Sequence, residues 1–102
     1  MITLCIRYTL DARKRDDFER YARGLKTSIP RCGGDLVGYW LPTKFAGPTN
    51  LATAMINFSS LAAYEQYRER LGRDPENVEN LRRAEESGCI LIEDRAILEP
   101  VA

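Results

Sequence analysis

Apolar and polar residues alternate without interruption over residues 2–10, a pattern that predicts a β-strand with two different faces. Side chains in a strand point to opposite sides in turn. One face therefore carries Ile2, Leu4, Ile6, Tyr8 and Leu10, and the other carries Thr3, Cys5, Arg7 and Thr9. The first face requires a hydrophobic layer against it. The second is small and mixed, with a single arginine, and it is where we expect a function to reside.

Two later segments have helical spacing. Asp11 is a candidate N-cap for a helix over roughly 11–28, which we expect to end before Pro30 because the residue preceding a proline avoids the α region. Its apolar stripe is Phe18, Tyr21, Ala22, Leu25 and Ile29. Ser59 or Ser60 caps a second helix that we expect to end at Gly72.

Asp74-Pro75 supplies a strong fresh start for a further helix, with an aspartate N-cap and a proline in the first turn. We expect this helix to turn Val78, Leu81 and Ala84 inward and to end at Gly88. Three more strands are predicted over residues 36–41, 51–58 and 89–98, with a long loop at 43–50.

The resulting order is strand, helix, strand, strand, broken helix, strand, within one domain spanning 1–102. Right-handed crossovers then give an α+β, ferredoxin-like βαββαβ fold with a four-stranded antiparallel sheet in the order 4-1-3-2. Helices cover one face only. We expect the open face to carry Thr3, Cys5, Arg7, Val37, Tyr39, Leu41, Leu51, Thr53, Met55, Leu91, Glu93 and Arg95. A face this apolar predicts a homodimer in which two sheets close an α/β-barrel.

Composition excludes several classes of function. Histidine is absent, which removes His-based triads and the usual zinc enzymes. The 15 basic and 15 acidic side chains cancel, so nothing favours nucleic acid or a membrane surface as a partner. Basic residues are in excess before residue 58 and acidic ones after it, which is typical of two solvated helices or of charge pairing between subunits.

Three cysteines without a C-x-x-C motif indicate neither a disulfide framework nor a metal site. No segment has the roughly 18 apolar residues of a membrane helix, and no signal peptide is recognisable. We therefore expect a cytoplasmic protein that uses no cofactor and no metal.

Several segments together resemble a known family. They are the opening Met1-Ile2-Thr3 with Ile6-Arg7-Tyr8, the strand end Gly38-Tyr39-Trp40-Leu41-Pro42, the run from Phe58 to Arg68, and the Asp74-Pro75 restart. In this order they resemble the NIPSNAP family over nearly the whole chain. The resemblance implies a dimeric α/β-barrel and no assigned biochemical role. Small bacterial relatives often carry histidine and glutamate after the second strand, whereas this chain has Thr43-Lys44-Phe45-Ala46-Gly47-Pro48.

Candidate site residues follow from the predicted open face: Arg7, Tyr39, Thr53, Glu93 and Arg95. If the first and last strands pair, Arg7 can reach Glu93. An arginine there either clamps a carboxylate, phosphate or enolate oxygen, or forms a structural ion pair with Glu93. Tyr39 is either a hydrogen-bond donor in a pocket or a packed interface aromatic. No pair of carboxylates suited to acid–base catalysis can be identified, so the catalytic residues stay unassigned.

Three classes of function remain. The first is a homodimer that binds a small apolar molecule with an anionic or carbonyl group, or that serves only in assembly. The second is a cofactor-free enzyme of the dimeric α/β-barrel type, monooxygenase-like or isomerase-like, acting on an apolar substrate with a carbonyl or carboxylate. The third, an RNA-binding module, is disfavoured because paired stacking aromatics are missing from the central strands.

Overall fold

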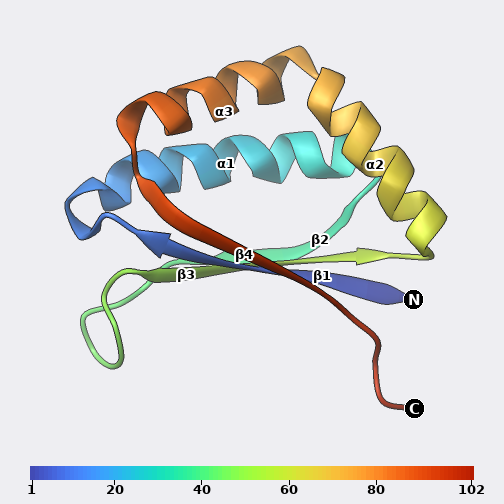
Figure 1. Ribbon diagram of the computed structural model, residues 1–102, viewed down its shortest axis with the longest axis horizontal. Coiled ribbons are helices and arrows are strands. Elements are labelled where there is room, and N and C mark those ends of the chain that lie inside the picture. The colour runs from blue at the N-terminus through green and yellow to red at the C-terminus, as the bar shows by residue number, and fades with distance from the viewer.

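A four-stranded antiparallel sheet forms one layer of the molecule, and the computed structural model describes all of residues 1–102 (Figure 1). The strands are β1 (Ile2–Leu10), β2 (Asp35–Trp40), β3 (Leu51–Phe58) and β4 (Ile90–Leu98). Their order is β2-β3-β1-β4, which confirms the predicted topology. The strands β2 and β4 are therefore the two edges of the sheet.

Helices cover one face of the sheet and leave the other open (Figure 1). A 3₁₀ turn (Ala12–Lys14) leads into α1 (Arg15–Arg31), and α2 (Leu61–Arg73) and α3 (Pro75–Ser87) follow β3. Asp11 does act as a cap, because its carboxylate accepts the Arg13 amide at 3.0 Å. The expected end before Pro30 is wrong. Ile29 is fully buried, and the amide of Cys32 still bonds the Ser28 carbonyl at 3.0 Å, so the last turn closes around the proline.

The core lies between the helices and the inner face of the sheet. The apolar face of β1, alternate residues of β3 and the predicted stripe of α1 are all buried in it: Leu4, Ile6, Tyr8, Leu10, Ala52, Ala54, Ile56, Phe58, Phe18, Tyr21, Ala22, Leu25 and Ile29. The small residues Ala52 and Ala54 let the helices approach β3 closely. The periodicity thus identified the core correctly in these three elements.

Two β-bulges reverse the predicted parity of both edge strands. In β2 the register to β3 slips between Leu36 and Gly38, and in β4 the register to β1 slips at Leu91. A shift of one residue sends every following side chain to the other face. Tyr39, Leu41, Glu93 and Arg95 therefore lie on the helix side, against the expectation for them, and Trp40, Ile92, Asp94 and Leu98 lie on the open face.

The inward face of α3 also differs from the prediction. Asn77 and Ala84 are buried, whereas Val78 and Leu81 stay exposed. The reason is that α3 packs against α1 rather than against the sheet. The side chain of Asn80 donates to the Tyr21 carbonyl at 2.9 Å, where Gly24 on α1 leaves room for it. Polar and small residues suit such a helix–helix contact, and Val78 and Leu81 lie outside it.

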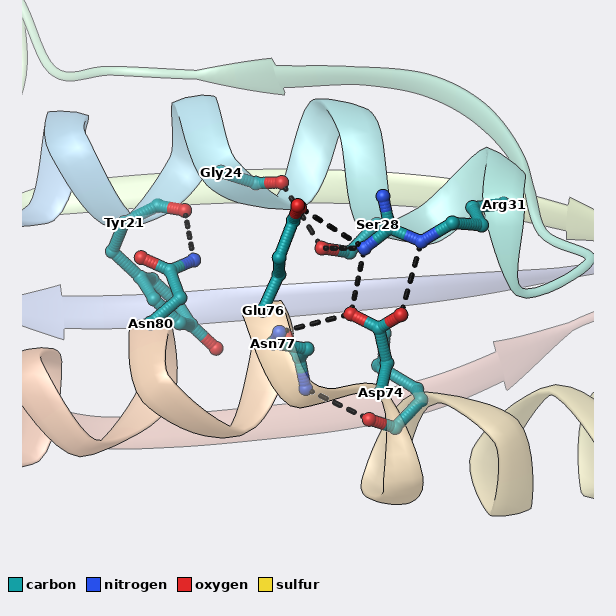
Figure 2. Close-up of polar contacts among 9 residues, drawn as sticks. Tyr21, Gly24, Ser28, Arg31, Asp74, Glu76, Asn77 and Asn80 are labelled. Carbon is teal, nitrogen blue, oxygen red and sulfur yellow. Dashed lines mark hydrogen bonds and ion pairs between the residues drawn. The ribbon is translucent and has the colours of Figure 1, made fainter.

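Asp74 joins α2, α3 and α1 at one point (Figure 2). It ends α2 after Arg73, past the predicted end at Gly72, and its carboxylate caps α3 by accepting the Asn77 amide at 2.9 Å. The same carboxylate accepts both Nε and Nη2 of Arg31, at 3.0 and 2.7 Å. The hydrogen bonds from Arg31, followed by that from the Asn77 amide, lower the pKa of Asp74 below its ordinary value.

We expect Asp74→Ala to lower Tm by roughly 4–8 °C at pH 7, because it removes a helix cap and a bidentate ion pair together. Since the pKa of Asp74 is lowered in the folded protein, its contribution is complete above about pH 4 and is lost as the pH falls through the folded-state pKa. Thermal unfolding from pH 7 to pH 2 measures this. Asp74→Asn, which keeps the cap, should lie between the two proteins, and a Tm difference independent of pH would contradict the assignment.

Candidate functional site

The five predicted site residues do not form one cluster. Arg7 and Thr53 are direct neighbours across β1 and β3 on the open face. Tyr39, Glu93 and Arg95 lie on the helix side because of the two bulges. The expected contact between Arg7 and Glu93 is therefore wrong: the register neighbour of Arg7 in β4 is Asp94, and Glu93 lies opposite Tyr8.

The open face carries one shallow hollow, of about 370 Å³, beside Arg7. Its lining is Cys5, Arg7, Asp94, Arg95, Ala96 and Leu98. Arg7 makes no ion pair within the chain. Around the hollow the face is apolar, with exposed Trp40, Leu51, Ile92 and Leu98. Such a surface is suited to contact with another protein layer more than to holding a small molecule by itself.

On the helix side, a pair of tyrosines, of which Tyr8 is buried and Tyr39 half-buried, joins β1 to β2. The hydroxyls of Tyr8 and Tyr39 lie 3.1 Å apart and share a hydrogen bond. Phe18 of α1 packs against both rings, with centroid distances of 4.8 Å to Tyr8 and 6.3 Å to Tyr39. The bulge in β2 is what places Tyr39 here. One hydroxyl of the pair donates and the other keeps a proton for a further acceptor.

Two further tyrosines point unpaired hydroxyls into the same region. Tyr21 of α1 and Tyr67 of α2 are buried, yet neither hydroxyl has a hydrogen-bond partner in the chain. Asn77 Oδ1 is the only fully enclosed side-chain oxygen or nitrogen without a partner. The hydroxyls of Tyr21 and Tyr67 therefore keep access to solvent, and each has a free proton to donate.

Glu93 and Arg95 form an ion pair on the helix side of β4. Arg95 Nη2 lies 2.6 Å from Glu93 Oε2, and the side chains are 38% and 28% exposed. Burial lowers the pKa of Arg95 while Glu93 raises it, and the net direction is upward, so the guanidinium stays charged. The charge of Glu93 acts on Tyr8, Tyr21 and Tyr39, and that of Arg95 acts on Tyr21 and Tyr67. Four hydroxyls and one ion pair thus converge.

Burial keeps these tyrosines protonated. It raises the pKa of Tyr21 to about 12 and moves the pKa of Tyr8, Tyr39 and Tyr67 further above the ordinary value of 10. All four phenols are neutral at pH 7. They can donate hydrogen bonds to a carbonyl, carboxylate or phenolate oxygen, and none is suited to act as a base.

This tyrosine cluster (Tyr8, Tyr21, Tyr39 and Tyr67) extends over the helix side of the sheet from β2 to β1, and β4 beside it is an edge that the helices leave uncovered. Helix α1 packs against β2 and α2 against β3, whereas no helix makes comparable contacts with β4. Ile97, on the helix side of β4, and Val78 and Leu81 of α3 accordingly stay exposed. An apolar molecule with one oxygen-bearing group has chemistry that matches such surroundings.

A separate hollow of about 490 Å³ lies elsewhere, between α1 and α3. It is lined by Arg20, Gly24, Ser28, Pro75, Glu76, Glu79, Asn80 and Arg83, and its four charged residues are all ion-paired within the chain. Figure 2 shows this helix interface, where Arg31 and Asn80 hold α3 to α1. Its size reflects the spacing of two helices, and no group in it is free for chemistry.

No group of three or more Cys, Asp or Glu side chains is arranged to hold a metal ion, and the three cysteines are buried and free. None of the helices is long and apolar enough to cross a membrane.

The helix-backed antiparallel sheet with one open face defines the class of protein as α+β and ferredoxin-like. The sequence matches the NIPSNAP family over residues 3–102, and the chain belongs to that family. No curated protein matches it.

Solved structures agree with this assignment. A protein from Agrobacterium tumefaciens has 24% identity and a TM-score of 0.85, over 99% of this chain and 94% of its own. An uncharacterized NIPSNAP domain protein from Burkholderia xenovorans has 20% identity and a TM-score of 0.82, over 100% and 96%. SnoaB, described as a cofactor-independent oxygenase from Streptomyces nogalater, has 12% identity and a TM-score of 0.69, over 99% and 93%. At these identities the likeness concerns the fold.

Sequence reasoning missed three members of the cluster. Tyr8, Tyr21 and Tyr67 fall on apolar stripes and read as core residues from their spacing alone. The available signal was their number: five tyrosines in 102 residues, four of them at inward positions where phenylalanine would pack equally well.

Proposed function

We propose that the protein is a homodimer, closed through its open sheet face, that binds a small apolar molecule bearing a carbonyl, carboxylate or phenolic oxygen. The ligand binds on the helix side of each subunit, at the tyrosine cluster and Arg95. The observation that carries the proposal is that the hydroxyls of Tyr21 and Tyr67 have no partner in the chain and lie within the electrostatic range of Arg95. A site with unused donors favours a ligand that accepts from them.

The dimer half of the proposal rests on the open face. Trp40, Leu51, Ile92 and Leu98 are exposed there in a single chain, and Met55 lies at its centre between Cys5 and Gly38. Packing two such faces removes the apolar surface from water, which stabilises the dimer. Arg7 and Asp94 are register neighbours on this face, so a dimer buries two charges of opposite sign side by side.

The ligand half assigns a separate role to each predicted residue. Arg95 supplies a charge-assisted hydrogen bond to an anionic oxygen, and Glu93 keeps the guanidinium in position. Tyr39 holds Tyr8 and leaves one phenol proton of the pair for the ligand. Thr53 and Arg7 belong to the dimer interior.

A thermal-shift screen with carboxylated and phenolic aromatic acids tests the ligand site. We expect hits to raise Tm of the native protein and to lose at least about tenfold in affinity in Arg95→Leu, which removes the charged donor. Arg7→Ala is the matched control, because it deletes an arginine from the other face of the same sheet.

The control also decides between the two faces. Binding lost in Arg7→Ala and retained in Arg95→Leu would move the ligand site to the open face and overturn the assignment. Equal binding by both variants would remove both arginines from the site.

The second candidate is a cofactor-free enzyme that uses the same cluster. What favours it is the neutral Tyr8–Tyr39 pair, which can donate a proton to a carbonyl oxygen on which negative charge develops. The structural neighbour SnoaB is described as a cofactor-independent oxygenase, although the likeness at 12% identity concerns the fold. Turnover of a bound hit, measured as oxygen uptake or isomerisation and abolished in Tyr8→Phe, would favour the enzyme over the binding protein.

A further inference from the structure

The loop of residues 41–50 between β2 and β3 projects from the sheet on the side opposite the helices (Figure 1). Its base is fixed to β1, because the Leu10 amide donates to the Asn50 carbonyl at 2.8 Å. Its tip has little support: the Phe45 amide donates to Thr43 Oγ1 at 3.4 Å. The Phe45 side chain is 95% exposed. A phenyl ring left in water at the end of a projecting loop is a candidate contact for a second molecule.

The loop is long enough to pass a sheet packed on the open face. Trp40, at the end of β2, lies on that face as the register neighbour of Thr53. Phe45 follows it five positions later, so the chain can extend roughly 16 Å from the sheet. Two packed sheets are only about 10 Å apart. Five extended residues are therefore enough to reach past the plane of a partner sheet, at its edge.

The topology indicates which edge of the partner it meets. The sheet order makes β2 and β4 the edges, and a two-fold axis parallel to the strands would bring β2 of one subunit beside β4 of the other. The loop base is level with the start of β4, because Leu10 bonds Asn50 and is also the register partner of Ile90. The next residue along β4 is Leu91, the bulged residue, which is 61% exposed.

Charge on the two segments is complementary. Lys44 precedes Phe45 in the loop, and Asp94 follows Leu91 closely in β4. Neither Lys44 nor Asp94 has an ion-pair partner within the chain. The unpaired positive charge of the loop thus complements the unpaired negative charge three residues along β4 from Leu91.

We propose that the β2–β3 loop is an arm that embraces a second copy of this chain, with Phe45 packed on the partner subunit's Leu91. The inference rests on the dimer proposed above. The arm contacts β4 of the second copy close to the Glu93–Arg95 ion pair of that copy, at the edge that no helix covers. Each ligand site of the dimer is then completed by the loop of the other subunit.

Cross-linking tests the contact directly. We expect the double variant Phe45→Cys/Leu91→Cys to give a covalent dimer in high yield with a short bismaleimide, seen by denaturing electrophoresis. The native cysteines are buried, so the unmodified protein sets a low background. Val101→Cys/Leu91→Cys is the control: Val101 is equally apolar and fully exposed, in the tail that projects on the same side from the far end of the sheet (Figure 1).

Affinity supplies the second readout. Phe45→Ser and Leu91→Ser should each raise the dimer dissociation constant about tenfold, and the double variant little more than either alone, because the two side chains form one contact. The proposed contact of the loop is wrong if the dimer sediments normally but does not cross-link. It is also wrong if Phe45→Ser leaves the dimer dissociation constant unchanged. An unmodified protein that sediments as a monomer overturns the dimer itself.

Discussion

Gly34→Ala is expected to destabilise the folded protein by about 3 kcal/mol, a large effect for a single methyl group. A Cβ atom at Gly34 would lie 2.7 Å from Ile29 Cγ2, 3.0 Å from Ile56 Cγ2 and 3.2 Å from a ring carbon of Tyr67. These neighbours belong to α1, β3 and α2, and all three are in the core. No single one of them can move without disturbing another, so the overpacking is not relieved locally.

The effect is steric, because the backbone of Gly34 lies outside the left-handed region that favours glycine. Urea denaturation measures it, with Gly72→Ala as the matched control. Gly72 lies within α2 and a Cβ atom there would contact nothing within 4 Å, so the same substitution should stabilise by about 0.5–1 kcal/mol. Equal midpoints for the two variants would show that the core at Gly34 relaxes, contrary to the close packing described above.

The elements that alternate regularly were predictable from the sequence, and the irregular ones were not. Residues 2–10 and 51–58 keep an unbroken period of two, and both strands and their buried faces were predicted correctly. The edge strands are apolar on both sides, so a slip in register leaves no mark in the pattern. The bulges at Val37 and Leu91 could therefore not be predicted, and the faces of Tyr39, Glu93 and Arg95 were predicted wrongly as a result.

The unpredicted bulges made the prediction of the candidate site less accurate than that of the fold. Topology depends on the order of elements, which tolerates an error of one residue. A site depends on the face to which each side chain points, and an error of one residue reverses that face. The prediction that Arg7 and Tyr39 share a pocket failed on the bulge in β2, while Tyr21 and Tyr67 became candidates only once their unpaired hydroxyls were visible.

Met55→Asp is expected to convert the proposed dimer to monomers while leaving the fold of each subunit intact. Met55 lies at the centre of the open face, between Cys5 of β1 and Gly38 of β2, and is half-buried in a single chain. In a face-to-face dimer a carboxylate there loses its water and replaces an apolar contact, and its two-fold copy adds a like charge. The dissociation constant should rise by at least roughly 100-fold.

Sedimentation velocity at micromolar concentration measures the change, with circular dichroism as the check on folding. Lys26→Asp on α1 is the control, because it introduces the same carboxylate on the exposed face of a helix. The dimer assignment predicts that the control sediments as the native protein does and that Met55→Asp sediments at half its mass. Because the ligand site lies on the helix side, the Met55→Asp monomer should retain the Glu93–Arg95 ion pair yet lack the partner loop. Weaker ligand binding by this folded monomer would support a ligand site that the partner's loop completes. A stable Met55→Asp dimer would refute the dimer through the open sheet face.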